Sequence, residues 1–357
     1  MRKYLLSLIS ALLFCTVAST ADEISPEAET YVDAALAIMQ QNFLHKDEID
    51  WAQLNRDTLA CAGRAETTAD TYPAIRLALR KLGDNHSYLQ LTPELARKES
   101  SSRAGQTCAT ASPTQAAKAY VPSPFQNRRV VEGAMVPGSV PFAQVVVPSF
   151  SGPDPDGCAT RMQATVAELA AKNPCGWIVD LRGNGGGNMW PMLVGVGPIL
   201  GEGNLGTFLN AASSLKWFYR EGRSGVQGNP ETFAKTTAAT PVRLKDAPLV
   251  AVITDRGTGS SGEIVAIAFR GRPDTRFFGE TTFGAASATS PFKLSDGAQI
   301  YLVVSTVLNR EGNEYPTGVR PDEAILSDVT TSPDDPVVRA ASEWLSRQQA
   351  CRLPSTK

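Results

Sequence analysis

The chain has 357 residues, with 34 lysines or arginines against 36 aspartates or glutamates, so its formal net charge is only −2. This balance excludes a general electrostatic attraction to nucleic acid or to an anionic membrane surface. The length favours two structural units over one. Only two histidines occur in the chain, which leaves few candidates for a general base.

Residues 1–21 have the pattern of a secretory signal peptide. Arg2 and Lys3 form a short basic region, an almost wholly apolar run follows over 5–17, and small residues lead up to Ala21. The apolar run is short for a bilayer span, and no later segment is long and apolar enough for one. We therefore expect an exported protein, periplasmic or secreted, whose mature chain has no membrane span.

The cysteines carry some information about disulfides and metals. Those after the signal peptide are Cys61, Cys108, Cys158, Cys175 and Cys351. Their odd number leaves at least one thiol without an intramolecular partner. Cys158 and Cys175 flank a predicted helix roughly 20 Å long, whereas bonded cysteines need Cα atoms within about 7 Å, so we do not expect them to pair. A Cys61–Cys108 pair stays open. No histidine or cysteine pattern has metal-site spacing, and we expect neither metal nor cofactor.

Residues 22–93 predict a small helical unit. Ser25-Pro26-Glu27 begins a helix with a capping residue, a proline in the first turn and an acid near the positive end of the helix dipole. Its apolar face is formed by Val32, Leu36, Met39 and Phe43. A second helix is expected over 72–82. It places His86 just past a helix end.

The rest of the chain divides into three parts. Residues 94–129 are rich in Ser, Ala, Thr and Gln and predict a connecting loop, and 348–357 form a tail. Between them, 130–347 alternate strands with helices, which predicts an α/β fold with parallel pairing. The expected strands are 142–147, 177–181, 249–254, 276–279 and 299–307, and the expected helices are 160–172 and 261–270. In such sheets chemistry gathers where loops leave the carboxyl ends of the strands.

Two loops at such positions carry candidate groups. Ser260 lies where a buried strand ends and a helix begins, so helix amides point toward a developing oxyanion beside its hydroxyl. The alternative is that Thr258, Ser260 or Ser261 merely caps the helix. The second loop, 180–188, has three consecutive glycines, which permit unusual backbone angles and close approach of a substrate. The alternative there is a flexible turn.

His86 is the strongest candidate for a base. Asp84, Asn85 and Ser87 beside it can hold an imidazole, although a structural histidine is the alternative, and His45 has the setting of a surface residue. No histidine follows Ser260, which excludes the Ser–Asp–His order of α/β-hydrolases. A different serine-hydrolase scaffold is needed.

Five motifs in order resemble those of the tail-specific, or C-terminal-processing, serine peptidase family. They are Leu82 to Ser87, Asp180 to Gly186, Ser260 to Ile264, Gly279 to Gly284 and Gly318 to Asp322. The resemblance covers about residues 28–330 and implies a crotonase-like (ClpP/crotonase) α/β core behind the helical unit. Many members carry a PDZ domain at this point of the chain, but the segment 91–140 is too short for one.

The resemblance also implies roles for particular residues. The family's nucleophile corresponds to Ser260 rather than Ser261, and Ala285 stands where Ser-Lys members have lysine. The chain is thus similar to the tricorn-like branch, in which a histidine, here His86, is the base and a glutamate orients it. We favour Glu314 over Glu311 for that role. Asn85 or Ser87 is the candidate to relay the hydrogen bond of that glutamate to the imidazole.

These features together predict an exported serine peptidase that acts on proteins or peptides. Ser260 forms an acyl-enzyme, His86 is the base, and the amides of Gly186 and Ser261 form the oxyanion hole. The alternative is a catalytically silent binding protein for a hydrophobic ligand or peptide, because the resemblance extends to interphotoreceptor retinoid-binding protein.

Overall fold

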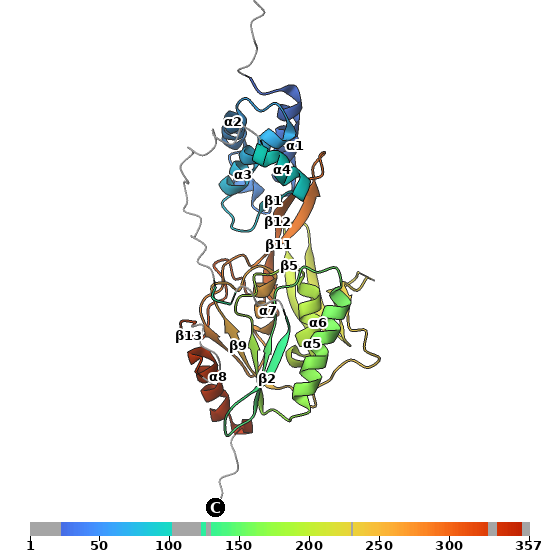
Figure 1. The fold of residues 1–357 in the computed structure, drawn as a ribbon, viewed down its shortest axis with the longest axis vertical. Coiled ribbons are helices and arrows are strands. Elements are labelled where there is room, and N and C mark those ends of the chain that lie inside the picture. The colour runs from blue at the N-terminus through green and yellow to red at the C-terminus, as the bar shows by residue number, and fades with distance from the viewer. Residues whose placement is uncertain (1–22, 102–122, 126–129, 230, 328–333, 352–357) are drawn as a thin grey trace, which may run out of the picture.

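The computed structural model describes residues 23–101, 123–125, 130–229, 231–327 and 334–351. A helical N-terminal unit sits at one end of an α/β core, and a long hairpin of the core reaches into it (Figure 1). The expected signal peptide lies outside the described residues. So does most of the expected connecting loop, but its beginning is helical: α4 spans Pro93–Ser101, and Leu95 is buried there.

The helical unit contains α1 (Pro26–Asn42), α2 (Trp51–Ala62) and α3 (Tyr72–Lys81). α1 and α3 lie where the apolar periodicity predicted them, and Ser25 Oγ accepts from Ala28 N at 3.2 Å as the α1 cap. α2 was not predicted. Its signal is Asp50, whose carboxylate accepts from Gln53 N at 2.9 Å.

The core is built on a sheet that has six strands within the described residues, in the order β13-β10-β9-β4-β3-β2. These strands are β2 (Glu132–Val136), β3 (Phe142–Val146), β4 (Gly176–Asp180), β9 (Leu249–Thr254), β10 (Thr275–Gly279) and β13 (Glu323–Ala324). All neighbours are parallel except β2 with β3. The α/β fold that the alternation of strands and helices predicted is confirmed.

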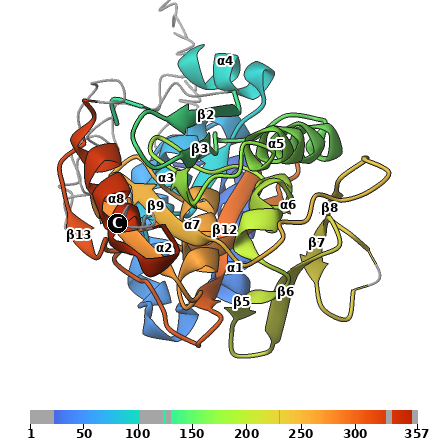
Figure 2. The same ribbon diagram turned by 90° about the horizontal axis from the view of Figure 1, so that it is seen from below.

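Helices cover both faces of this sheet. α5 (Pro155–Ala170), α6 (Met189–Leu200) and α7 (Ser261–Phe269) share one hydrophobic core with it, and α8 (Pro336–Arg347) packs on the opposite face (Figure 2). α6 and α8 were not among the predicted elements. α8 buries Val337, Val338, Ala341 and Leu345.

A second, antiparallel sheet joins the core to the helical unit. Its order within the described residues is β1-β12-β5-β6-β7-β8, with β11 beside β12. The strands are β1 (Tyr88–Gln90), β5 (Gly203–Leu209), β6 (Ser214–Arg220), β7 (Arg223–Val226), β8 (Ala234–Lys235), β11 (Ser287–Lys293) and β12 (Gln299–Asn309). Phe292, Ile300 and Leu302 of the β11–β12 hairpin pack into the core of the helical unit. The hairpin is therefore shared by both parts of the molecule.

The hairpin tip is held by two tyrosines. Asp296 accepts hydrogen bonds from Tyr31 Oη at 2.7 Å and from Tyr72 Oη at 2.5 Å. Burial and the neighbouring carboxylate raise the pKa of both tyrosines, so they stay protonated and donate to Asp296.

Cys175 pairs with Cys351, which attaches the chain after α8 to the start of β4. Cys158 is free and buried, so the predicted absence of a Cys158–Cys175 bond is confirmed. Cys61 is also disulfide-bonded, and Cys108 lies outside the described residues. Among the helices that the structure describes, none is long and apolar enough to cross a membrane.

Candidate active site

Ser260 and His86 come together from opposite parts of the chain. Nε2 of His86 lies 2.8 Å from Ser260 Oγ. Ser260 occupies the turn between β9 and α7, with φ +51° and ψ −122°. A non-glycine residue in such a conformation costs roughly 1–3 kcal/mol. The turn directs the Ser260 hydroxyl toward the imidazole.

The loop after α3 fixes the position of His86. Asp84 Oδ1 accepts from the backbone N–H groups of His86 at 2.6 Å and of Ser87 at 2.5 Å. On the ring, Nδ1 lies 2.9 Å from Ser287 Oγ at the start of β11. In the neutral tautomer that accepts from Ser260 at Nε2, Nδ1 carries the proton and donates to Ser287. Burial lowers the pKa of His86, an effect that the Asp84 charge opposes, so the imidazole is neutral at pH 7.

The residues expected to orient His86 lie elsewhere. Glu314 is exposed, and its backbone pairs with Leu308. Glu311 accepts from Asn313 Nδ2 at 3.3 Å. Within the described residues, no hydrogen bond or ion pair joins either glutamate to the imidazole.

The expected relay residues do not reach the ring either. Asn85 is exposed, and Ser87 Oγ accepts from Val303 N at 3.0 Å. Ser287 Oγ is the group that contacts Nδ1 of the ring. Sequence reasoning missed it because it lies 201 residues from His86, and its one hint is its place two residues after Ala285.

Glu263 joins the Ser260 turn, between β9 and α7, to the segment before β11. Its carboxylate is fully buried and accepts from Ser260 N at 3.1 Å, Thr282 Oγ1 at 2.5 Å, Gly284 N at 2.8 Å and Ala285 N at 2.7 Å. Burial raises the pKa of Glu263, and the four donors work against that rise. Ala285 stands where Ser-Lys members of the family have lysine. In this structure its backbone N–H donates to Glu263, which links it to the Ser260 turn.

The glycine loop packs directly against Ser260. Gly186 has φ +106° and Gly187 has φ +109°. Gly186 N donates to Asn184 Oδ1 at 3.0 Å, and Ser261 Oγ donates to Gly187 O at 2.5 Å. In the described part of the chain, no hydrogen bond engages the N–H groups of Gly187 or Ser261.

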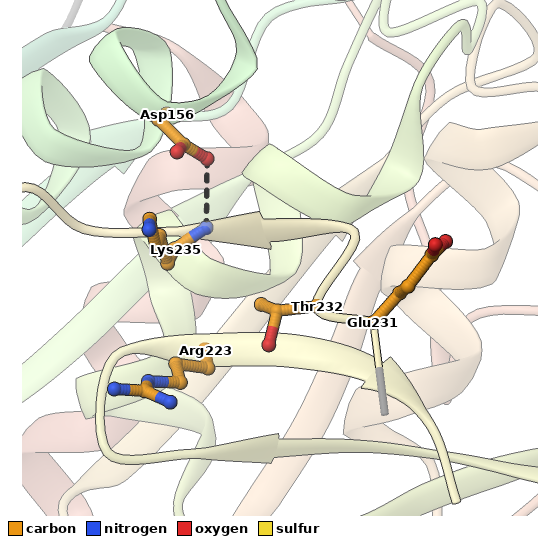
Figure 3. A pocket seen from close by; sticks show the side chains of 5 residues that line it. All are labelled: Asp156, Arg223, Glu231, Thr232 and Lys235. Atoms are coloured by element: carbon orange, nitrogen blue, oxygen red, sulfur yellow. Dashed lines mark hydrogen bonds between the residues drawn. The ribbon is translucent and has the colours of Figure 1, made fainter. Parts of the chain in front are cut away.

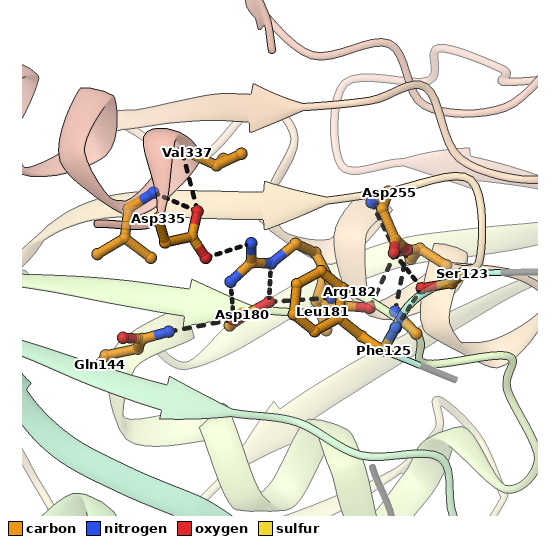
Figure 4. A network of polar contacts seen from close by, with 12 residues as sticks. Ser123, Phe125, Gln144, Asp180, Leu181, Arg182, Asp255, Asp335 and Val337 are labelled. Carbon is orange, nitrogen blue, oxygen red and sulfur yellow. Dashed lines mark hydrogen bonds and ion pairs between the residues drawn. The ribbon is translucent and has the colours of Figure 1, made fainter. Parts of the chain in front are cut away.

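A buried ionic network holds the start of the glycine loop (Figure 4). Arg182, only 1% exposed, donates through Nη2 to Asp180 Oδ2 at 2.7 Å and through Nη1 to Asp335 Oδ2 at 2.6 Å. Burial lowers the pKa of the Arg182 guanidinium. The carboxylates of Asp180 and Asp335 raise it by more, so the net effect is a raised pKa. Asp335 also caps α8 by accepting from Val337 N at 2.9 Å. The network therefore connects α8 to the glycine loop.

Asp255 joins the glycine loop to the loop between β9 and Ser260. Its Oδ1 accepts from Gly183 N at 2.9 Å and from Gly257 N at 3.0 Å, and Ser123 Oγ donates to its Oδ2. One buried carboxylate at the carboxyl end of β9 thus sets the spacing of both loops.

A separate pocket lies between the start of α5 and the β7–β8 strands (Figure 3). It is lined by Asp156, Arg223, Glu231, Thr232 and Lys235. It shares no residue with the Ser260–His86 site, and its charged lining does not suit a hydrophobic ligand.

We predict that Gly186→Ala lowers kcat/KM by at least about tenfold. An added Cβ would lie 2.7 Å from Ser260 Cβ and 2.9 Å from Ser261 N, so the nucleophile turn would have to move. The matched control is Gly297→Ala in the hairpin turn, with a similar φ of +95° but no atom within 4 Å of the new Cβ. Both variants should lose about 1–2 kcal/mol of unfolding free energy from the left-handed backbone, and Gly186→Ala should lose more because of its contacts with Ser260 and Ser261. Denaturant titration measures both losses. Equal activity of the two variants would contradict the prediction.

The chain is similar to known peptidases. The model of peptidase family S41 matches residues 141–325. The nisin-resistance protein of Lactococcus lactis is 26% identical over 325 residues, covering 91% of this chain and 89% of that protein. The carboxyl-terminal-processing protease of Synechocystis sp. is 31% identical over 186 residues, covering 50% of this chain but only 39% of that protein.

Solved structures show the same fold. A lipoprotein from Streptococcus agalactiae superposes with a TM-score of 0.61 at 21% identity, over 90% of this chain and 97% of that one. The photosystem II D1 C-terminal processing protease gives a TM-score of 0.53 at 17% identity, over 85% and 94%.

A serine hydroxyl bonded to a half-buried neutral histidine, with the serine at the carboxyl end of a parallel strand, is the arrangement of a serine hydrolase. The chain belongs to peptidase family S41 and is a serine-type peptidase.

Proposed function

We propose that Ser260 is the nucleophile and His86 the general base of this peptidase. The observation that carries the proposal is the 2.8 Å contact between His86 Nε2 and Ser260 Oγ. Nucleophile and base within hydrogen-bond reach, with a third group on the other ring nitrogen, are what nucleophilic catalysis requires. Ser287 supplies that third group.

In the proposed reaction, Ser260 Oγ attacks the peptide carbonyl carbon while His86 Nε2 takes the hydroxyl proton. The tetrahedral intermediate collapses, and the C–N bond breaks as the leaving amine takes that proton from His86. A water molecule then attacks the acyl-enzyme with His86 again as base, which releases the acid and regenerates Ser260.

The oxyanion is held by backbone amides. The Ser261 N–H, at the start of α7, is one donor of the predicted pair, and the helix dipole adds to its effect. Gly186, the other predicted donor, gives its N–H to Asn184 Oδ1, so substrate must displace that contact. The Gly187 N–H, which carries no such bond, is available in the same loop.

We further propose that the core is crotonase-like and that the protein is exported and cleaves proteins or peptides. Peptides that lack stable structure are the first substrates to test. Because a relative that matches 91% of this chain is named a nisin-resistance protein, nisin belongs among them.

The test is labelling of the active serine. We expect a fluorophosphonate probe to modify the wild-type protein at Ser260, as mapped by peptide mass spectrometry, and to block cleavage of an unstructured protein such as casein. Modification at another serine, or cleavage that survives complete labelling, would exclude this mechanism. Tight binding of a hydrophobic ligand without any labelling would instead support the silent binding protein.

We predict that Ser287→Ala lowers kcat about fivefold to tenfold while KM changes little. The hydroxyl orients the imidazole through one neutral hydrogen bond, worth about 1 kcal/mol. Ser287→Thr, which keeps the hydroxyl, should retain most activity. Ser290→Ala, on the same strand but the opposite face, is the control in steady-state assays. Full activity of Ser287→Ala would show that Nδ1 needs no partner there.

A further inference from the structure

The first strand after the candidate base carries an exposed aromatic pair. Tyr88, two residues after His86, is 45% exposed. Its ring stacks on Tyr301 of β12, with centroids 4.9 Å apart and parallel planes. Stacked aromatic rings that support each other offer a rigid apolar surface.

The strand register shows which way this pair faces. Tyr88 lies opposite Tyr301, and Tyr301 lies opposite the exposed Pro291 of β11. The adjacent row, Leu89–Ile300–Phe292, packs into the core of the helical unit. Because side chains alternate across a sheet, the row Tyr88–Tyr301–Pro291 lies on the opposite face of the hairpin from the row Leu89–Ile300–Phe292.

The same face of the hairpin leads to the candidate catalytic site. On β11, Ser287 and Pro291 are four residues apart and share one face. The register shift between Ala288 and Thr289 leaves the extra residue in β12, so β11 keeps its alternation. Ser287 Oγ contacts His86 Nδ1. The aromatic row thus lies about 13 Å along the strand from the orienting serine, at roughly 3.3 Å per residue.

We propose that Tyr88, Tyr301 and Pro291 form a substrate subsite that binds an aromatic or large apolar side chain. This rests on the proposed function, because the subsite's occupant is the polypeptide held at Ser260. An extended chain covers about 13 Å in four residues, so the recognised side chain lies about four positions from the cleaved bond. The neighbouring row, Gln90–Gln299–Lys293, provides a polar rim.

The experiment uses a peptide series in which Phe or Ala occupies each position up to six residues on either side of the cleaved bond. For wild type we expect Phe to be preferred over Ala about fivefold to tenfold in kcat/KM at one position about four residues away. In Tyr88→Ala and Tyr301→Ala that ratio should fall to about one. Leu215→Ala, which removes another exposed apolar side chain of the same sheet, should leave the ratio as in wild type.

A ratio that stays near tenfold in both tyrosine variants, or a wild type without any such position, would overturn the subsite. Failure of the subsite can be told apart from failure of the catalytic proposal by measuring the binding of fluorescent Phe and Ala peptides to the Ser260→Ala variant. If wild type cleaves nothing but Ser260→Ala binds the Phe peptide more tightly, and only when Tyr88 is present, the subsite holds and the catalytic proposal fails.

Discussion

Ser260→Ala should lower peptide hydrolysis by at least about 10³-fold, because the variant has no nucleophile to form the acyl-enzyme. Removing one triad member in a serine peptidase costs nearly all covalent catalysis, and the remaining rate comes from binding and the oxyanion site. The hydroxyl contacts His86 Nε2, and Ser260 is also the N-cap of α7 in a capping box with Glu263. We therefore expect a loss of about 1 kcal/mol of unfolding free energy beside the loss of activity. Single-turnover assays with a fluorogenic peptide measure the loss.

Ser261→Ala is the matched control for that variant. It removes the neighbouring hydroxyl, which donates to Gly187 O, but keeps the backbone N–H at the start of α7. We expect a loss of no more than about tenfold. If Ser261→Ala were the inactive variant and Ser260→Ala the active one, the nucleophile would have been assigned one residue too early.

His86→Gln should lower kcat by about 10²-fold to 10⁴-fold, since a positioned general base contributes that much. Glutamine keeps most of the volume and polarity of the ring but cannot take a proton from Ser260. His45→Gln is the control, because His45 is exposed and contacts Glu48 at 3.2 Å on the surface. Thermal unfolding of both variants shows whether either loss comes from misfolding.

The pH dependence should identify the same group. Only the neutral imidazole accepts a proton, so kcat/KM falls as the pH drops through the pKa of His86 in the free enzyme. Burial lowers that pKa below 6.5, and the acid limb should therefore have its midpoint below pH 6.5. An acid limb centred clearly above pH 6.5, or one that is unchanged in His86→Gln, would point to a different base.

The predicted elements that the structure contains are those with a strong local signal. The strand over 249–254 coincides with β9, and the helix expected over 261–270 is α7, Ser261–Phe269. A short apolar run indicates a buried strand, and a serine-glycine turn indicates its end. Both signals come from neighbouring residues and can be recognised without knowledge of the tertiary contacts. By contrast, α6 was not predicted, because it is apolar on all sides and has a proline inside it, which hides helical periodicity.

The candidate site divides in the same way. Ser260 was identified from its place between strand and helix, and His86 from the scarcity of histidines and the polar residues around it. Ser287 and Glu263 have no such local mark. Glu263 was noted only as part of a helix start, yet its carboxylate holds four donors from two segments. Glu314 was favoured for its nearness to a motif along the chain, which does not measure distance in space.

By itself the sequence determined an α/β core with a helical unit before it, and it named one serine and one histidine as the pair to bring together. Periodicity, turn residues and composition suffice for that, because they act over a few neighbouring residues. Only the tertiary structure decided that His86 meets Ser260 across 174 residues and that Ser287, not a glutamate, faces its other nitrogen. Those contacts depend on the path of the β11–β12 hairpin, which is set by packing and strand pairing with the distant helical unit.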